Sequence, residues 1–216
     1  MSRENGFRDF FDQVEPVHLK EPLAETLGAF KNQSVALEYS FIDAVKLAGH
    51  ACPSVTGAYL SCQLALSALY VDDVPVRGGI RVTVYGEPDE GALGVMAQVC
   101  TFITGAAPGT GFKGLGPLFP RKDLLRFEPA DAGCGGVCLG FERLDTGAAV
   151  LTRFRPGLVP FPEEKGRQLA EMMKLVVSGA ASEQQAAEFR DLWMEKIELM
   201  AVEKKGINKW LELLEA

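Results

Sequence analysis

The chain has 216 residues, of which 47% are hydrophobic and 24% are charged. This composition excludes wholesale disorder and predicts one large domain or two small ones with a sizeable core. The formal net charge of −7 argues against a general nucleic-acid binder. No stretch approaches the roughly 18 uncharged apolar residues of a membrane span.

Residues 1–40 are expected to form an N-terminal lead, with a short helix over 21–30 and a strand over 34–39. The spacing of apolar residues predicts helices over 41–47 and 53–70, a strand over 80–84 and a helix over 90–103. A glycine-rich loop follows, from residue 105 to residue 117. Together with the hairpin described next, residues 41–160 are expected to form an α+β core domain that contains the functional site.

Two alternating segments, 137–141 and 150–154, flank Asp145-Thr146-Gly147 and predict a β-hairpin. Amphipathic helices are expected over 163–178 and 182–203, so residues 161–216 are predicted to be a helical region packed on the core. Helices and strands interleave without a strict βαβ repeat. The fold class expected is therefore α+β, with a mixed or antiparallel sheet packed with helices.

The first ten residues contain no apolar run, which predicts that no secretory signal is present. Five cysteines are an odd number, and without an export signal they predict reduced thiols in a cytoplasmic protein. Cys134 and Cys138 have a spacing found in zinc sites, but the second half of a closed site is missing. The ordinary alternative for each cysteine is a small buried apolar residue.

The segment Gly49-His50-Ala51-Cys52-Pro53 lies where one predicted helix ends and the next begins. Pro53 fits the first position of a helix and disfavours helical geometry at Cys52, which makes Cys52 the expected N-cap. At that position the helix dipole favours a thiolate. His50 and Cys52 are two residues apart in an extended segment, so their side chains should project to the same side. An imidazole paired with a thiolate suits Zn²⁺.

The segment Ala48-Gly49-His50-Ala51-Cys52-Pro53, with Tyr59 seven residues after the cysteine, resembles the signature of the FmdE-like family, which takes its name from a component of formylmethanofuran dehydrogenase. A second block, residues 103–111, is similar to a Thr-Gly-Cys-Thr-x-Gly-Lys-Gly segment of that family. The resemblance extends over about residues 41–201. It implies that His50 and Cys52 are metal ligands, and it implies a homodimer by analogy.

The chain departs from the family pattern in its second block, where Ala106 and Thr110 occupy the positions of the family's cysteine and lysine. The zinc-ribbon cysteines found near the C-terminus of many members are also missing. Cys100 is therefore the first candidate for a third ligand, and a buried core thiol is the alternative.

The resemblance also implies that Tyr59, Thr104 and Lys113 contact the metal's surroundings or a substrate. Lys113 lies within a glycine-rich stretch, 109–114, that matches the G-x-G-x-x-G pattern. A helix precedes this stretch and none can follow it, so a dinucleotide site is excluded. Backbone N–H groups of such a loop, with Lys113, can still bind an anion. A surface loop with a solvated lysine is the alternative.

Three hypotheses follow. The first is a metal-binding protein of this family that holds one divalent ion, expected to be zinc, at an open site facing a small-molecule substrate. The second is a metal-independent enzyme in which Cys52 is the nucleophile and His50 its proton acceptor. The third is a non-catalytic adaptor that uses its C-terminal helices as an interface. The first is preferred, with enzyme status left open and with no nucleic-acid or membrane partner expected.

Overall fold

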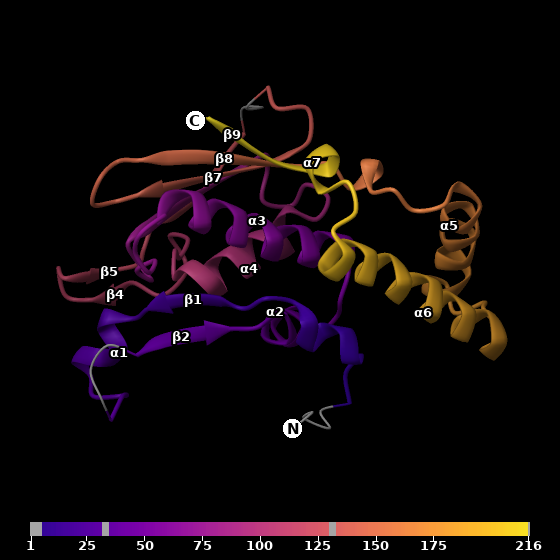
Figure 1. The fold of residues 1–216 in the computed structure, drawn as a ribbon, viewed down its shortest axis with the longest axis horizontal. Coiled ribbons are helices and arrows are strands. Elements are labelled where there is room, and N and C mark those ends of the chain that lie inside the picture. The colour runs from indigo at the N-terminus through magenta and orange to yellow at the C-terminus, as the bar shows by residue number, and fades with distance from the viewer. Residues whose placement is uncertain (1–5, 32–34, 130–132, 216) are drawn as a thin grey trace.

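A computed structural model describes residues 6–31, 35–129 and 133–215 (Figure 1). The helices are α1 (Pro22–Thr26), α2 (Phe41–Ala48), α3 (Pro53–Leu69), α4 (Leu93–Thr104), α5 (Glu163–Val177), α6 (Glu183–Glu198) and α7 (Ile207–Trp210). The strands are β1 (Val17–Lys20), β2 (Ala36–Tyr39), β3 (Ile80–Tyr85), β4 (Gly114–Leu115), β5 (Phe119–Pro120), β6 (Leu125–Glu128), β7 (Val137–Arg143), β8 (Ala149–Phe154) and β9 (Leu211–Glu215). Short 3-10 turns lie at Asp9–Gln13 and Pro156–Leu158, and a π-helical turn at Leu199–Glu203.

The central sheet has five strands in the order β6-β3-β7-β8-β9. β6 runs parallel to β3, whereas the other neighbours are antiparallel, so the sheet is mixed. Alternation along β3 directs Ile80, Val82 and Val84 into the core. Helices α3 and α4 lie on this face of the sheet, and the β1–β2 hairpin with α2 lies beyond them (Figure 1). The predicted α+β class with a mixed sheet packed with helices is confirmed.

Helix α3 lies between the sheet and the β1–β2 hairpin (Figure 1). Its residues from Val55 to Cys62 are all buried, which explains why this stretch carries no charged side chain. Gly57 is required where β8 crosses the helix, because a Cβ there would lie 2.6 Å from the Phe154 ring. The hydroxyl of Tyr59 lies 2.8 Å from the carbonyl oxygen of Tyr39 at the end of β2. These contacts fix α3 from both sides.

The N-terminal lead contains a strand that its sequence pattern does not reveal. β1 pairs with β2 from Val17↔Tyr39 to Lys20↔Ala36. Leu19 of β1 is fully buried, whereas His18 is exposed. The β1–β2 pair therefore forms an outer layer of the fold (Figure 1).

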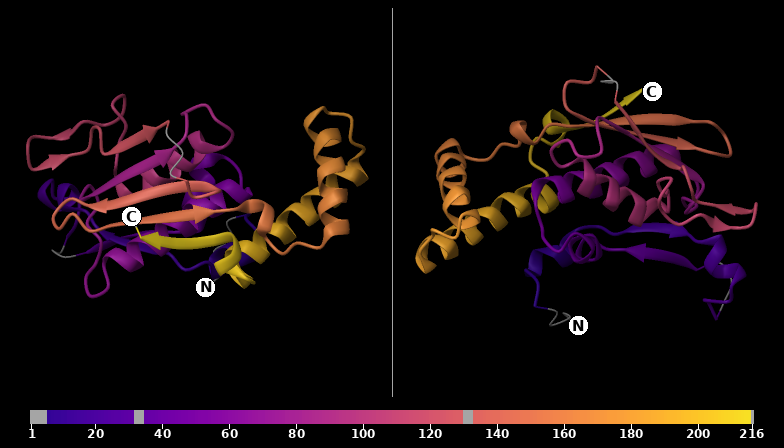
Figure 2. Two further views of the ribbon diagram at one scale, coloured as in Figure 1. Left: turned by 90° about the horizontal axis from the view of Figure 1, so that it is seen from above. Right: turned by 180° about the vertical axis from the view of Figure 1, so that it is seen from behind.

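The C-terminal region is only partly helical. α5 and α6 form a helical hairpin that extends away from the rest of the molecule (Figures 1 and 2), and Leu169 and Leu192 are buried residues on the two helices. The chain then returns through α7, and β9 pairs with β8 to complete the sheet. Within the described residues, no helix is both long and apolar enough to cross a membrane.

Two of the five cysteines form a disulfide, Cys134–Cys138. The expectation that all five thiols are reduced is therefore wrong for this pair. The turn between them contains Gly135 with φ +66°, and it brings the two Cα atoms to 6.5 Å, a separation that a disulfide can span. Cys52, Cys62 and Cys100 are free thiols.

Candidate functional site

The turn between α2 and α3 carries the predicted ligand pair. Ser40 and Asp43 form a capping box that begins α2, and Gly49 ends it in the left-handed conformation with φ +74°. The next three residues cross to α3. Ala51 is buried, whereas His50 is exposed and Cys52 is partly exposed. His50 therefore faces solvent, whereas Cys52 lies at the edge of the hydrophobic core and packs partly against it.

Cys52 is the N-cap of α3, as its position before Pro53 predicts. Its backbone is extended (φ −149°, ψ 167°), and its Sγ accepts a hydrogen bond from the Val55 N–H at 3.4 Å. Its carbonyl oxygen accepts the first helical hydrogen bond, from the Thr56 N–H. The sulfur thus lies at the N-terminal end of a 17-residue helix, which is the positive end of the helix dipole.

The ring of His50 is held by the backbone carbonyl of a neighbouring residue. Its Nδ1 lies 2.9 Å from the carbonyl oxygen of Ala48, the last residue of α2. Because a carbonyl can only accept, this hydrogen bond requires a proton on Nδ1. In the neutral imidazole, Nε2 then carries a free lone pair. A backbone carbonyl on the other ring nitrogen is the usual partner of a metal-binding histidine.

The C-terminal helical hairpin touches this turn. Trp193 of α6 donates its indole N–H to the carbonyl oxygen of Ala51 at 2.8 Å. Phe189, one turn earlier, stacks on the Trp193 ring with centroids 5.6 Å apart. The backbone between the two predicted ligands is therefore anchored by a residue 142 positions away.

Tyr59 and Thr104 lie in the core. Tyr59 is fully buried, and its hydroxyl lies 2.8 and 3.0 Å from the carbonyl oxygens of Tyr39 and Glu15. Burial is the main reason that the pKa of Tyr59 is raised above its ordinary value. Thr104 is also fully buried, and its hydroxyl donates to the Cys100 carbonyl and accepts from the Ala106 N–H. Both hydroxyl groups therefore have backbone partners in the positions where the structure places them.

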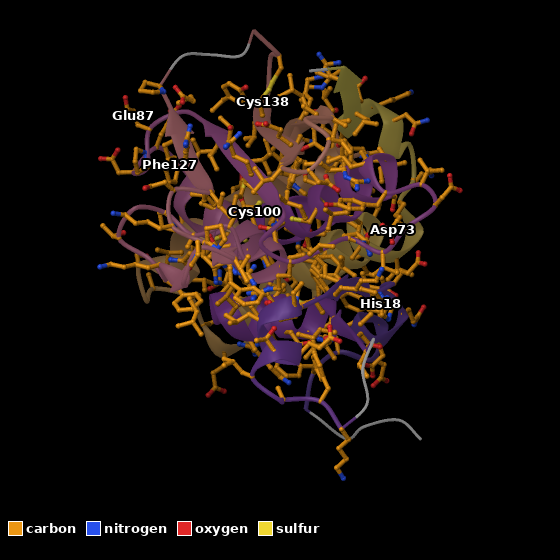
Figure 3. The ribbon with its side chains drawn as sticks, turned by 90° about the vertical axis from the view of Figure 1, so that its left-hand side faces the viewer. His18, Asp73, Glu87, Cys100, Phe127 and Cys138 are labelled. Atoms are coloured by element: carbon orange, nitrogen blue, oxygen red, sulfur yellow. A yellow bond between two sulfur atoms is a disulfide. The ribbon has the colours of Figure 1, made fainter. Side chains whose placement is uncertain are left out.

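Cys100 lies in the middle of the molecule (Figure 3). It is fully buried on α4, and its sulfur is 3.8 Å from that of Cys62 on α3. Cys62 follows Cys52 by ten residues, which corresponds to about 15 Å along the helix axis. The hydrogen bond with Cys100 and burial raise the pKa of the Cys62 thiol well above its ordinary value. This environment matches the buried-thiol alternative for Cys100.

Lys113 is exposed in the glycine-rich loop. The loop folds into a small β4–β5 hairpin, in which a Cβ at Gly114 would lie 1.9 Å from the Phe119 carbonyl oxygen. A glycine is therefore required where the two strands meet. Ala106, at the family's cysteine position, is fully buried.

Of the residues predicted from the sequence, the structure brings only His50 and Cys52 to one turn. Across the ranges that the structure describes, no three His, Cys, Asp or Glu side chains gather in a group that could hold a metal ion. The local donor set is therefore one imidazole nitrogen and one sulfur. The assignment of Cys100 as a ligand, and of Tyr59, Thr104 and Lys113 as contacts, stays a prediction.

The structure also contains a buried charge cluster that the sequence patterns do not predict. Glu21, at the start of α1, pairs with Arg77 at 2.9 Å and with Arg121 at 2.5 Å. The Arg121 side chain is only 3% exposed, and its burial lowers the pKa of the guanidinium despite the attraction of Glu21. The partners are 56 and 100 residues from Glu21, so no local spacing could reveal them.

Comparison with known proteins does not identify a family for this chain. No protein-family model matches the chain, and no curated protein matches it significantly. The resemblance to the FmdE-like family therefore rests on the two sequence blocks alone and stays a prediction.

Proposed function

We propose that this chain binds one divalent, zinc-like metal ion through Nε2 of His50 and Sγ of Cys52. The observation that carries this proposal is the hydrogen bond between His50 Nδ1 and the Ala48 carbonyl, which leaves Nε2 free as a donor. Cys52, the N-cap of α3, adds a sulfur at the N-terminal end of the helix.

The residues fit half of a tetrahedral zinc shell. Imidazole nitrogen and thiolate sulfur are both usual zinc ligands, and two further positions are left for water, a substrate or another donor. A bound ion would supply Lewis acidity towards an oxygen ligand. The chain itself supplies orientation: the Ala48 carbonyl holds the His50 ring, and the Trp193 indole holds the Ala51 backbone between the two donors.

We also propose a family, a cellular location and an oligomeric state for this chain. Membership of the FmdE-like family is supported by the 48–53 and 103–111 sequence blocks. A cytoplasmic location is supported by the three free thiols, and the Cys134–Cys138 disulfide counts against it. Homodimer formation rests on the family analogy.

Elemental analysis of protein purified without a metal-affinity tag tests the proposal. Wild-type protein supplied with zinc should retain about one ion per chain after dialysis, because an imidazole and a thiolate bind it together. The variants His50→Ala and Cys52→Ser should retain little. His18→Ala is the matched control, since His18 is the only other histidine and lies on β1.

Equal zinc content in wild type and in the His50 and Cys52 variants would refute the proposal, and so would wild-type protein that retains no zinc. Circular dichroism of each variant distinguishes loss of the site from loss of the fold. Cys52→Ser keeps a good N-cap residue and should fold as wild type does.

A further inference from the structure

A cavity of about 380 Å³ lies along α4, apart from the residues of the candidate metal site. Its volume falls in the range of about 300–1,000 Å³ that is typical of small-molecule sites. Apolar side chains and ring carbons from α2, α4, the following loop and β6 form most of its wall: Leu47, Ala97, Phe102, Pro108, Leu125 and Phe127. Leu47 in this wall is 42% exposed, so the cavity opens at the surface.

Three polar side chains also line the cavity. They are Arg77, Gln98 and Thr101, and Arg77 is the only charged one among the lining residues. An apolar wall with a few polar groups that orient the ligand is the usual composition of a site for a small organic molecule. Because Arg77 is positively charged, the cavity favours a ligand whose polar end is negatively charged.

The guanidinium of Arg77 is held rigidly. Its Nε and Nη2 donate to the Phe102 carbonyl at the end of α4, and its Nη1 donates to Glu21. Each of the two Nη atoms has a second hydrogen, so the group can still donate to a ligand. The Tyr39 ring lies 5.5 Å from the guanidinium carbon, and this contact also helps to hold it.

The charge around Arg77 is not balanced by side chains. Glu21 is one carboxylate shared by two guanidinium groups, Arg77 and Arg121, so the cluster carries a formal charge of +1. In the described part of the chain, Nη1 of Arg121 is buried and has no hydrogen-bond partner. Carbonyl groups at the C-terminal end of α4 offset only part of this charge, since the end of a helix is equivalent to about half a negative charge.

From this geometry we propose that the α4 cavity binds a small organic acid whose carboxylate pairs with Arg77 and whose apolar body packs against Ala97, Phe102 and Phe127. A guanidinium matches a carboxylate with two parallel hydrogen bonds, which makes an organic anion the best complement to a positively charged group beside an apolar wall. This inference is independent of the metal proposal, because none of the cavity's lining residues is His50 or Cys52.

Titration with octanoate and with 1-octanol, followed by leucine methyl NMR signals, tests the ligand class. Both compounds have the same apolar chain, and only octanoate carries the carboxylate. Octanoate should shift the methyl signals of Leu47 and Leu125 and should bind about tenfold more tightly than 1-octanol, a difference of about 1.4 kcal/mol. Equal affinities would overturn the role of Arg77, and methyl shifts confined to other leucines would overturn the location.

The variant Ala97→Phe tests the cavity itself. Ala97 is buried in its wall, so a phenyl ring there should fill the space and weaken octanoate binding at least tenfold. Ala170→Phe is the matched control, because Ala170 is exposed on α5 and the affinity should not change. If Ala97→Phe fails to fold, the octanoate and 1-octanol titrations of wild-type protein still decide the question. Unchanged binding by a folded Ala97→Phe variant would overturn the proposal.

Discussion

Helix α3 carries two free cysteines in opposite environments. Cys52 is its N-cap, partly exposed, with its sulfur accepting a backbone N–H. Cys62 lies ten residues later, fully buried, with its sulfur against that of Cys100. The residue type is the same, so the difference in chemistry comes from position. The thiol at the N-terminal end of the helix is accessible to solvent, whereas the thiol in the middle is packed in the core.

The largest expected effect is in thiol reactivity. Native protein treated with iodoacetamide near neutral pH should be modified at Cys52 at least about a thousandfold faster than at Cys62 or Cys100. Reaction of a core thiol requires an opening that costs several kcal/mol, whereas Cys52 needs none. Mass spectrometry of digested samples over time measures all three rates, and comparable rates for Cys52 and Cys62 would remove the distinction.

The same substitution should have different effects on the free energy of unfolding at the two positions. Cys62→Ser places a hydroxyl in the core and should lower the free energy of unfolding by about 1–3 kcal/mol. Cys52→Ser should leave it unchanged or raise it by up to about 1 kcal/mol, because serine is a preferred N-cap. Urea unfolding of the two variants measures the difference. Equal losses would mean that Cys52 is packed as a core residue.

A smaller effect is expected at Tyr59, in the buried part of α3. Tyr59→Phe removes its hydrogen bonds to the carbonyls of Glu15 and Tyr39 and should cost about 0.5–1.5 kcal/mol at neutral pH.

The loss of wild-type stability at alkaline pH should depend on this residue. Because burial raises the pKa of Tyr59 in the folded state, its stabilising contribution is complete below the unfolded-state pKa of about 10 and declines as the pH rises above it. Tyr59→Phe should therefore show a shallower alkaline decline than wild type. Tyr85→Phe, on β3, is the control, and identical profiles for wild type and Tyr59→Phe would contradict the assignment.

Sequence reasoning recovered the elements that have a local signal. Pro53 after Cys52 marks the start of α3. The amphipathic pattern predicts a helix from residue 182, and α6 begins at Glu183, with Ser182 and Gln185 forming its capping box. β9 has no such signal, since Leu211-Glu212-Leu213-Leu214 forms a strand only because β8 offers an edge for pairing.

Sequence patterns predict only those parts of the candidate site that depend on residues close together in the chain. The turn at His50 and Cys52 could be inferred from neighbouring residues, but the indole of Trp193 that holds Ala51 comes from another part of the chain. Tyr59 follows Cys52 on the same helix, yet its hydroxyl turns to the β1–β2 hairpin. The Glu21–Arg77–Arg121 cluster depends entirely on tertiary contacts.

X-ray absorption spectroscopy of the zinc-loaded protein tests the central claim most directly, because it counts ligand types around the ion. One sulfur at about 2.3 Å and one imidazole nitrogen at about 2.0–2.1 Å, with lighter atoms completing the shell, is the predicted result. Cys52→Ser should remove the sulfur signal, and His50→Ala the imidazole signal. A shell with no sulfur, or with two or more, would contradict a site built on His50 and Cys52.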